Sequence, residues 1–452
     1  MRFYLLQTKL NGIKSIDKEI TIEYYNNTIS DDIDIMDNHV KAIYGPNGAG
    51  KTGIVYGMQI YKNFFLGSSY LTIENASGVL KSLINQKNKR LSIENIFAVI
   101  DDNDKCESIY KHRIVLGSIT GERYELENEY FGKLVGNKIN LVDKYNTIFE
   151  VQNGEIKALS KKIKSRDKII EVTKNNLRMK SFLASIAEGK FNDFSDEFFN
   201  NISYTLISFV VSVRVVLQDS DRPNYIDINK IKSSLEKIRK IQAVMNNEEL
   251  FSQVFTTNKI VDNAYDLVPK IEYPKYQEHI KKVTEFVKVF KDDLVEIEIK
   301  PYENGDNYEC ENIMVYSDGR RINKKFESTG IKKIIDTYDA IADVENGGIV
   351  FYDEFDANLH DVLLVKLVEY IMDYSKGQFI FTTHNMAPMD MLQQKKHGID
   401  FLSSDSKLVS WKKNGNYKAS SLYRGGFIES SPFNIEAFDF LGKFGSDNEW
   451  NK

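Results

Sequence analysis

The chain has 452 residues, of which 42% are hydrophobic and 28% are charged, and its formal net charge is −5. The length permits two or three domains, and this composition is typical of an ordinary globular protein. The negative net charge argues against a protein coated in nucleic acid, so any such contact would need a local basic patch.

The sequence offers no targeting or membrane-spanning segment. No apolar run approaches the roughly 18–20 residues needed to span a bilayer; the longest candidate, residues 204–217, is shorter and contains Arg214. The N-terminus lacks the apolar core of a signal peptide. Cys106 and Cys310 are too far apart for a C-x2-C metal motif. We therefore expect a cytoplasmic protein with reduced thiols and no membrane contact.

The first third of the chain reads as strands around one helix. Residues 3–25 predict a β-meander with a turn at Asn11-Gly12, and residues 39–44 predict a buried strand. A helix is expected over 51–65, and further strands are expected over 93–100, 108–116 and 122–131.

The middle of the chain has a different character. Helical spacing of apolar residues is clearest at Ile280, Val283, Val287, Phe290 and Leu294. Strand alternation then resumes at Val295, Ile297 and Ile299. We therefore predict a helical lid or arm at 155–293, inserted between the two halves of an α/β domain at 1–154 and 294–452.

A glycine-rich turn between the predicted strand and helix is the first functional signal. Gly45, Gly50, Lys51 and Thr52 fit the pattern G-x4-G-K-[ST]. In such loops backbone N–H groups cradle phosphates, the lysine reaches the terminal phosphates and the threonine binds Mg2+. The predicted nucleotide-binding residues are Gly45, Pro46, Asn47, Gly48, Ala49, Gly50, Lys51 and Thr52, and the predicted ligands are ATP and Mg2+.

Two later strands supply the partners of this loop. Residues 349–352 are an apolar run that ends in Asp353 and Glu354, and residues 378–384 are another that ends in His384. Asp353 is placed to hold Mg2+ with Thr52, and Glu354 to polarise the attacking water as general base. His384 can reach the γ-phosphate. Because ligands of open α/β sheets bind at the carboxyl ends of strands, we expect these segments to converge.

The order "GPNGAGKT", "FESTGIKK" (326–333), "IVFYDEFDANLH" and "FIFTTH" resembles the heads of ABC-type ATPases. More narrowly, it resembles the AAA15/AAA21 group, the OLD, RloA, AbiL-like and PARIS AriA-like ATPases of bacterial phage defence. The C-terminal stretch "FDFLGKFG" (438–445) is similar to another motif of that group. The resemblance implies an α/β, ABC-type P-loop ATPase head, with a mixed sheet, flanking helices and an N-terminal antiparallel β-subdomain.

The resemblance also implies roles for single residues. Ser328, Thr329 and Gly330 would form a signature that closes over the γ-phosphate of a second protomer, and Asp356 would communicate across that dimer. Glu354, His384 and Lys51 would be catalytic, and His360 would be the histidine of the "LH" pair. Gln86 is a weak candidate for a Mg2+-ligating glutamine. A competing interpretation is that Ser328–Gly330 forms an ordinary helix N-cap. In the same way, Asp356 and His360 would be first-turn helix residues that bind no ligand.

No nuclease is expected in the chain itself. A Toprim domain needs more than the 68 residues that follow His384, and the D-x-D strings at Asp32/Asp34, Asp102/Asp104 and Asp219/Asp221 read as polar turns. The resemblance therefore implies a homo-oligomer, at least a dimer, that works with a separate effector, a Toprim or other nuclease, and with a phage protein or DNA as trigger.

Three functions remain open from the sequence. The first is an ATP-dependent sensor or switch in anti-phage, abortive-infection defence. The second is a RecF-like or SMC-like repair ATPase that binds duplex DNA through the lysine-rich residues 157–180, which can equally be a solvated helix face. The third is a scaffold whose ATP is purely architectural.

Overall fold

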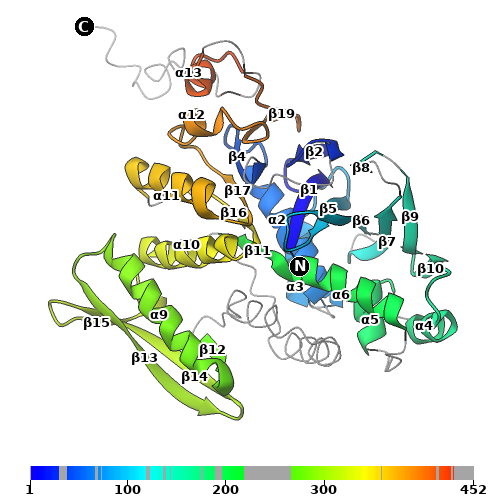
Figure 1. Ribbon diagram of the computed structural model, residues 1–452, viewed down its shortest axis with the longest axis horizontal. Helices are drawn as coiled ribbons and strands as arrows, with labels where there is room; N and C mark the ends of the chain where they lie inside the picture. Colours follow the sequence, from blue (N-terminus) through cyan, green and yellow to red (C-terminus); the bar gives the residue numbers. More distant parts are fainter. Residues whose placement is uncertain are drawn as a thin grey trace, which may run out of the picture.

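The computed structural model describes residues 2–29, 38–66, 70–72, 74–118, 123–135, 139–142, 144–174, 177–188, 196–217, 266–357, 359–413, 417–428 and 431. Four sheets, the smallest a two-stranded pair, and their covering helices make up this part of the chain (Figure 1). Within it, no helix is long and apolar enough to cross a membrane.

The N-terminal part forms a seven-stranded antiparallel sheet of order β10-β9-β7-β6-β5-β1-β2. Its strands are β1 (Arg2–Asn11), β2 (Ile20–Glu23), β5 (Arg90–Ile100), β6 (Cys106–Gly117), β7 (Glu125–Leu134), β9 (Tyr145–Gln152) and β10 (Glu155–Leu159). The predicted meander is confirmed, because β1 and β2 pair antiparallel from Gln7↔Glu23 to Leu10↔Ile20. The three strands expected between 93 and 131 are also confirmed as β5, β6 and β7. Two short strands, β3 (Thr28–Ile29) and β8 (Ile139–Asn140), pair with each other.

The second sheet is mixed and has the order β11-β16-β17-β4-β18-β19. Its strands are β4 (Val40–Tyr44), β11 (Val213–Val216), β16 (Ile349–Tyr352), β17 (Gln378–Thr382), β18 (Ile399–Leu402) and β19 (Leu408–Ser410). Only β19 is antiparallel to its neighbour. The carboxyl ends of β4, β16 and β17 therefore meet at one edge, as the sequence predicted.

The third sheet contains β12 (Asp266–Pro269), β13 (Leu294–Asn304), β14 (Asn307–Tyr316) and β15 (Arg321–Asn323). The helix α9 packs on it at one end of the molecule (Figure 1). The helices are α2 (Lys51–Leu66), α3 (Glu74–Leu83), α4 (Arg166–Thr173), α5 (Phe182–Glu188), α6 (Glu197–Ser212), α9 (Tyr273–Lys288), α10 (Thr329–Glu345), α11 (Asp361–Tyr374), α12 (Met389–Leu392) and α13 (Ala419–Arg424), with 3-10 turns η1 (Tyr70–Thr72), η3 (Lys270–Glu272) and η4 (Lys324–Phe326).

The mixed sheet is buried on both faces, which explains its continuous apolar strands. Ile349 and Phe351 of β16 belong to a core shared with α2, α6 and the antiparallel sheet. Val350 and Tyr352 point the other way, into a core shared with α10 and α11. Because alternate residues of β16 pack into two different cores, the strand is held in place from both faces of the sheet.

The predicted helical lid or arm at 155–293 contains strands as well as helices in the part that the structure describes. The helices α4, α5, α6 and α9 lie there, but β10 continues the antiparallel sheet and β11 joins the mixed sheet beside β16. The missed signal is Asn153-Gly154: both have positive φ, 50° and 83°, which is the geometry that an Asn-Gly hairpin turn requires. The boundary drawn after residue 154 therefore cuts a hairpin. Farther on, α6 ends at Ser212 and the β-branched run Val213–Val216 forms β11.

The stripe on α9 is confirmed in its helical part, since Ile280, Val283 and Val287 are all buried. The alternation that follows is shifted at its start. A bulge between Leu294 and Glu296 turns Leu294 inward and leaves Val295 48% exposed, whereas Ile297 is 8% exposed. A bulge inserts a residue into the ladder and changes the face that its neighbours point to.

Candidate nucleotide-binding site

The turn from β4 to α2 has the tight backbone that a phosphate loop requires. Gly45 and Gly50 have positive φ angles of 157° and 110°. A Cβ atom on Gly45 would lie 2.3 Å from the carbonyl oxygen of Leu402, and one on Gly50 would lie 2.8 Å from Cγ1 of Ile16. Side chains are therefore excluded at both positions by neighbouring elements, and Asn47 and Gly48 remain exposed at the open side of the loop.

Lys51 opens α2 and folds back over the loop. Its Nζ donates to the carbonyl oxygens of Gly45 (2.7 Å) and Pro46 (3.1 Å). Burial lowers the pKa of Lys51, while the nearby charges of Asp353, Glu354 and Asp356 oppose that shift. A phosphate at the loop would give this buried cation a charged acceptor in place of two neutral ones.

Asp353 lies at the end of β16 and is 2% exposed. Its Oδ1 accepts a hydrogen bond from Oγ1 of Thr382 at 2.7 Å. Burial raises the pKa of Asp353, and hydrogen bonds from Thr382 and Thr52 lower it. A carboxylate beside a hydroxyl matches the oxygen ligands that Mg2+ prefers, so Asp353 and Thr52 fit the metal-binding role predicted for them.

Glu354 adopts a backbone conformation that is rare for a residue with a side chain, with φ of 47°. Its N–H donates to Oγ1 of Thr382 at 2.8 Å, and its carbonyl oxygen accepts from Nζ of Lys333. Such conformations cost about 1–3 kcal/mol and persist only when the surroundings impose them. Here bonds from β17 and α10 hold the peptide groups on both sides of Glu354.

His384 follows β17 and is exposed. Partial burial and the charge of Lys51 lower the pKa of His384, while the charges of three nearby carboxylates, Asp356, Glu354 and Asp353, oppose that shift. The loop is shaped by Asn385, whose N–H donates to Thr383 Oγ1 (2.9 Å) and whose Nδ2 donates to Asp361 Oδ1 (2.6 Å). A lowered pKa favours the neutral imidazole at pH 7.

The candidate signature begins α10. Ser328 and Thr329 are exposed, and Oγ of Ser328 accepts the N–H of Ile331 at 3.3 Å. Ser328 is therefore a helix N-cap, as one interpretation expected. The cap does not decide whether the same residues also meet a second protomer, and that role stays a prediction.

Asp356 and His360 follow β16 on the way to α11. Oδ1 of Asp356 is buried and has no hydrogen-bond partner in the described part of the chain. His360 occupies the N-cap position of α11 without a side-chain cap bond. The amide of Gln86 donates to the carbonyls of Lys81 (2.6 Å) and Ile84 (3.2 Å) in its own turn, so it is not held toward the metal-binding pair. The motif at 438–445 lies outside the described residues.

Three contributors escaped the sequence reasoning. Thr382 links Asp353 to Glu354, and Lys333 binds the Glu354 carbonyl. The exposed Lys14, in the β1–β2 loop, places its ammonium 4.4 Å from the ring centroid of Tyr56, and its charge lowers the pKa of Asp353. Thr382 could have been inferred from its place at the end of the strand beside β16. No local pattern distinguishes Lys14.

Part of the chain matches a known family model, and the chain is similar to several solved structures at low sequence identity. A family model described as "AAA domain, putative AbiEii toxin, Type IV TA system" matches residues 247–390, and no curated protein matches the chain. Similar solved structures include the Smc head of Pyrococcus furiosus bound to the C-terminal domain of ScpA (16% identity, 90% of this chain and 96% of that chain, TM-score 0.39). They also include the SMC head of Thermotoga maritima (15%, 91% and 100%, TM-score 0.30).

The predicted fold class is confirmed. An antiparallel N-terminal sheet stands beside a mixed sheet whose strand ends carry the phosphate loop, the acidic pair and the histidine. The AAA-domain model matches residues 247–390, which include α10, the acidic pair Asp353–Glu354 and His384.

Proposed function

We propose that the chain hydrolyses ATP and acts as an ATP-dependent sensor or switch in a bacterial anti-phage, abortive-infection system. The observation that carries the ATPase proposal is that Lys51, the Asp353–Glu354 pair and His384 follow the adjacent parallel strands β4, β16 and β17, whose carboxyl ends lie at one edge of the mixed sheet. Defence is supported by the motifs of the AAA15/AAA21 group and by the AbiEii description of the matching family model.

In this proposal each residue has a distinct task. Gly45–Thr52 cradle the phosphates, and Lys51 leaves its two carbonyl acceptors for them. Thr52 and Asp353 would hold Mg2+, which supplies charge neutralisation at the phosphates when it is bound. Glu354 orients and deprotonates the attacking water, and neutral His384 accepts or donates a hydrogen bond at the γ-phosphate.

The test of ATP use compares two substitutions with a surface control. Lys51→Ala removes the phosphate-binding cation and should abolish binding of a fluorescent ATP analogue. Glu354→Gln should bind ATP normally and lose turnover by about 100-fold or more, as loss of a positioned general base does. Lys81→Ala, an exposed lysine on α3, should match the unchanged protein. Undiminished hydrolysis in Glu354→Gln would remove the general-base assignment.

The signature role needs a variant that separates capping from contact with a second protomer. Ser328→Asp keeps an N-cap acceptor on α10 but places a negative charge where a partner's γ-phosphate would lie. We expect unchanged thermal stability, together with loss of hydrolysis and of ATP-induced dimers in size-exclusion chromatography. Normal dimers and turnover in this variant would leave Ser328 as a cap alone.

The effector and the trigger are proposed as separate molecules. Co-expression with the adjacent genes, followed by affinity capture, should retrieve a nuclease of the Toprim or another class. Phage plaque assays should show protection that Lys51→Ala removes. Protection that survives Lys51→Ala would contradict an ATP-dependent switch.

A repair ATPase that binds duplex DNA is the second candidate. The structure places Lys161, Lys162 and Lys164 exposed in the turn before α4, where they can meet phosphates. Salt-sensitive DNA binding that is lost when these three lysines are changed to glutamate would favour this function. Absence of DNA binding at low salt would argue against it.

A further inference from the structure

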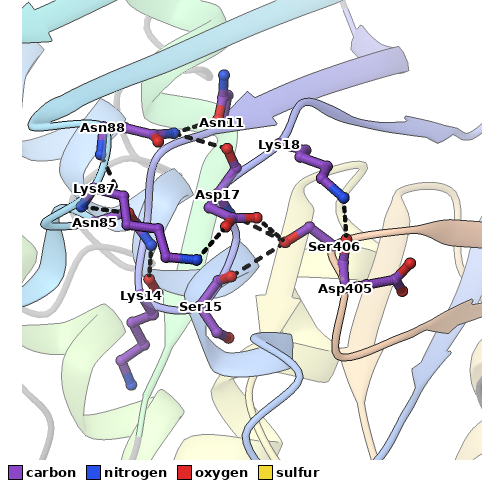
Figure 2. A network of polar contacts seen from close by, with 10 residues as sticks. All are labelled: Asn11, Lys14, Ser15, Asp17, Lys18, Asn85, Lys87, Asn88, Asp405 and Ser406. Carbon is purple, nitrogen blue, oxygen red and sulfur yellow. Dashed lines mark hydrogen bonds and ion pairs between the residues drawn. The ribbon is translucent and has the colours of Figure 1, made fainter.

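The loop between β1 and β2, residues 12–19, lies against Gly50 of the phosphate loop. It is also tied to two distant segments (Figure 2). On one side is the turn that follows α3, residues 83–88. On the other is the β18–β19 turn, residues 403–407. Apart from Gly12 of the predicted turn and the candidate Gln86, no residue of these three segments was singled out in the sequence.

The turn after α3 binds the backbone of the loop. The N–H of Lys14 donates to the Leu83 carbonyl, and Nδ2 of Asn85 donates to the Lys14 carbonyl, both at 2.7 Å. Nδ2 of Asn88 donates to the Asp17 carbonyl at 2.9 Å. These bonds fix the backbone at both ends of residues 14–17.

The β18–β19 turn holds the same loop through Ser406, which is 4% exposed. Its Oγ accepts the N–H of Asp17 (3.1 Å) and lies 3.1 Å from the Ser15 carbonyl and 3.2 Å from Asp17 Oδ1, either of which takes its proton. Lys87 Nζ closes the clamp on Asp17 Oδ2 at 2.8 Å. The Asp17 carboxylate thus joins segments from both sides of the loop (Figure 2).

Backbone strain is concentrated around this clamp. Among the described residues other than glycine, positive φ angles occur at Lys14, Lys89, Asp104, Asn153, Glu354 and Ser406. Lys14 and Ser406 belong to the clamp, Lys89 directly follows Asn88, and Glu354 belongs to the nucleotide site. Outside tight turns such as Asn153-Gly154, strained backbone conformations cluster at functional sites, where the surrounding structure imposes them.

The clamped loop touches the nucleotide site in two places. Ile16 Cγ1 and Ser15 Oγ lie 2.8 Å and 2.9 Å from the position of a Cβ on Gly50, so this loop forms the wall behind the phosphate loop. Lys14 lies over Tyr56 of α2, and its positive charge acts on Asp353. A shift of residues 14–16 would therefore move both the support of Gly50 and the charge beside the metal-binding carboxylate.

We propose that Asp17 and Ser406 are positioning residues of the nucleotide site, which act through residues 14–16 on Gly50 and on the charge beside Asp353. The proposal rests on the proposed ATP-binding function and assigns that site a support that includes the β18–β19 turn. Neither residue is among the predicted nucleotide-binding residues Gly45–Thr52.

The test measures affinity for a fluorescent ATP analogue and thermal unfolding of the nucleotide-free protein in Ser406→Ala, Asp17→Asn and the double variant. Each single change should weaken binding about tenfold, the effect of one lost hydrogen bond to a charged or buried group. Because both changes break one clamp, the double variant should bind no worse than the weaker single variant. The control is Asp101→Asn, a turn aspartate whose Oδ1 accepts the N–H groups of Asn103 and Lys105 at 2.8 Å away from the phosphate loop.

A purely structural role predicts a different pattern. In that case Ser406→Ala and Asp17→Asn would lower the melting temperature as Asp101→Asn does and leave nucleotide affinity unchanged, which would overturn the proposal. Strictly multiplicative losses in the double variant would also overturn it, since they would mean that the two residues act independently. Lys51→Ala tests the proposed ATP-binding function separately from the positioning role of Asp17 and Ser406. If Lys51→Ala still binds the nucleotide, the ATP-binding function itself is refuted.

Discussion

Replacing Thr382 by valine tests whether one hydroxyl organises the catalytic end of the site. Thr382 is 1% exposed, and valine has nearly the same shape, so the substitution removes bonds without opening a cavity. Two bonds disappear: the donation to Asp353 Oδ1 at 2.7 Å and the acceptance from Glu354 N–H at 2.8 Å. A hydrogen bond to a charged group contributes about 1.5–3 kcal/mol, and an orphaned buried N–H costs a similar amount.

We therefore expect Thr382→Val to lower the free energy of unfolding by about 2–4 kcal/mol. The Mg2+ concentration for half-maximal ATP hydrolysis should rise about tenfold or more, because the metal-binding carboxylate loses its fixed orientation. The Thr382 bond lowers the pKa of Asp353, so its loss raises that pKa. Protonated Asp353 cannot bind Mg2+, and activity in the variant should be lost at a higher pH as the pH falls.

The assay is Mg2+-dependent phosphate release at several pH values, with urea unfolding alongside. Thr284→Val is the control: this threonine is 6% exposed and donates to the Ile280 carbonyl at 2.8 Å within α9, far from the site. Thr284→Val should lose some stability and keep the Mg2+ and pH profiles. Unchanged profiles in Thr382→Val would refute the assignment of Thr382 as the link between Asp353 and Glu354.

Three further predictions concern the scaffold. Gln378 is 1% exposed and its amide binds both the N–H and the carbonyl of Leu5 (Nε2 to oxygen, 2.9 Å); Gln378→Leu should cost about 2–4 kcal/mol in urea unfolding, since two buried backbone groups lose their partner. Lys41 and Asp400 form a buried ion pair of 2.7 Å, so Lys41→Met should cost about 3–5 kcal/mol while Lys41→Met with Asp400→Leu recovers most of it. A double variant as unstable as the single would contradict an uncompensated charge as the cause. Burial, Lys41 and Lys396 lower the pKa of His397 to about 4, so the stability that neutral His397 provides above about pH 6.5 is lost as the pH falls toward 4. The decrease in the free energy of unfolding between pH 7.5 and pH 5.0 should be smaller in His397→Leu by on the order of 1 kcal/mol, after allowance for the partial solvent contact of the side chain.

Much of the fold was predictable because its strands and helices have strong local patterns. Apolar runs and turn residues predict the meander, the buried strand before the phosphate loop, and the strands β16 and β17. The failures have local causes too. The Asn153-Gly154 hairpin was a readable signal, whereas the bulge at Leu294 depends on pairing with β14 and could not be inferred from alternation alone.

The strand β11 was lost for a different reason. The apolar run 204–217 is buried throughout most of its length, and burial removes the periodicity that distinguishes a helix from a strand. The change from α6 to β11 occurs between Ser212 and Val213, where the valine-rich end pairs with β16. That pairing partner lies more than 130 residues away in sequence, so only the folded sheet decides the assignment.

The chemistry of the candidate site and its geometry have different origins. Motifs provided the reactive groups, because a lysine, carboxylates and a histidine must occur at fixed positions on strand ends to meet a phosphate and a metal. Their conformations come from groups that no motif contains. Glu354 keeps its rare backbone only because Thr382 and Lys333, which come from two other elements, hold the peptides beside it. Gly50 is supported by Ser15 and Ile16, which are held in turn by Ser406, almost four hundred residues farther along the chain. Contacts between residues so far apart in sequence form only when both sheets have docked. The geometry of the site therefore depends on tertiary structure, whereas its reactive groups can be identified from the sequence.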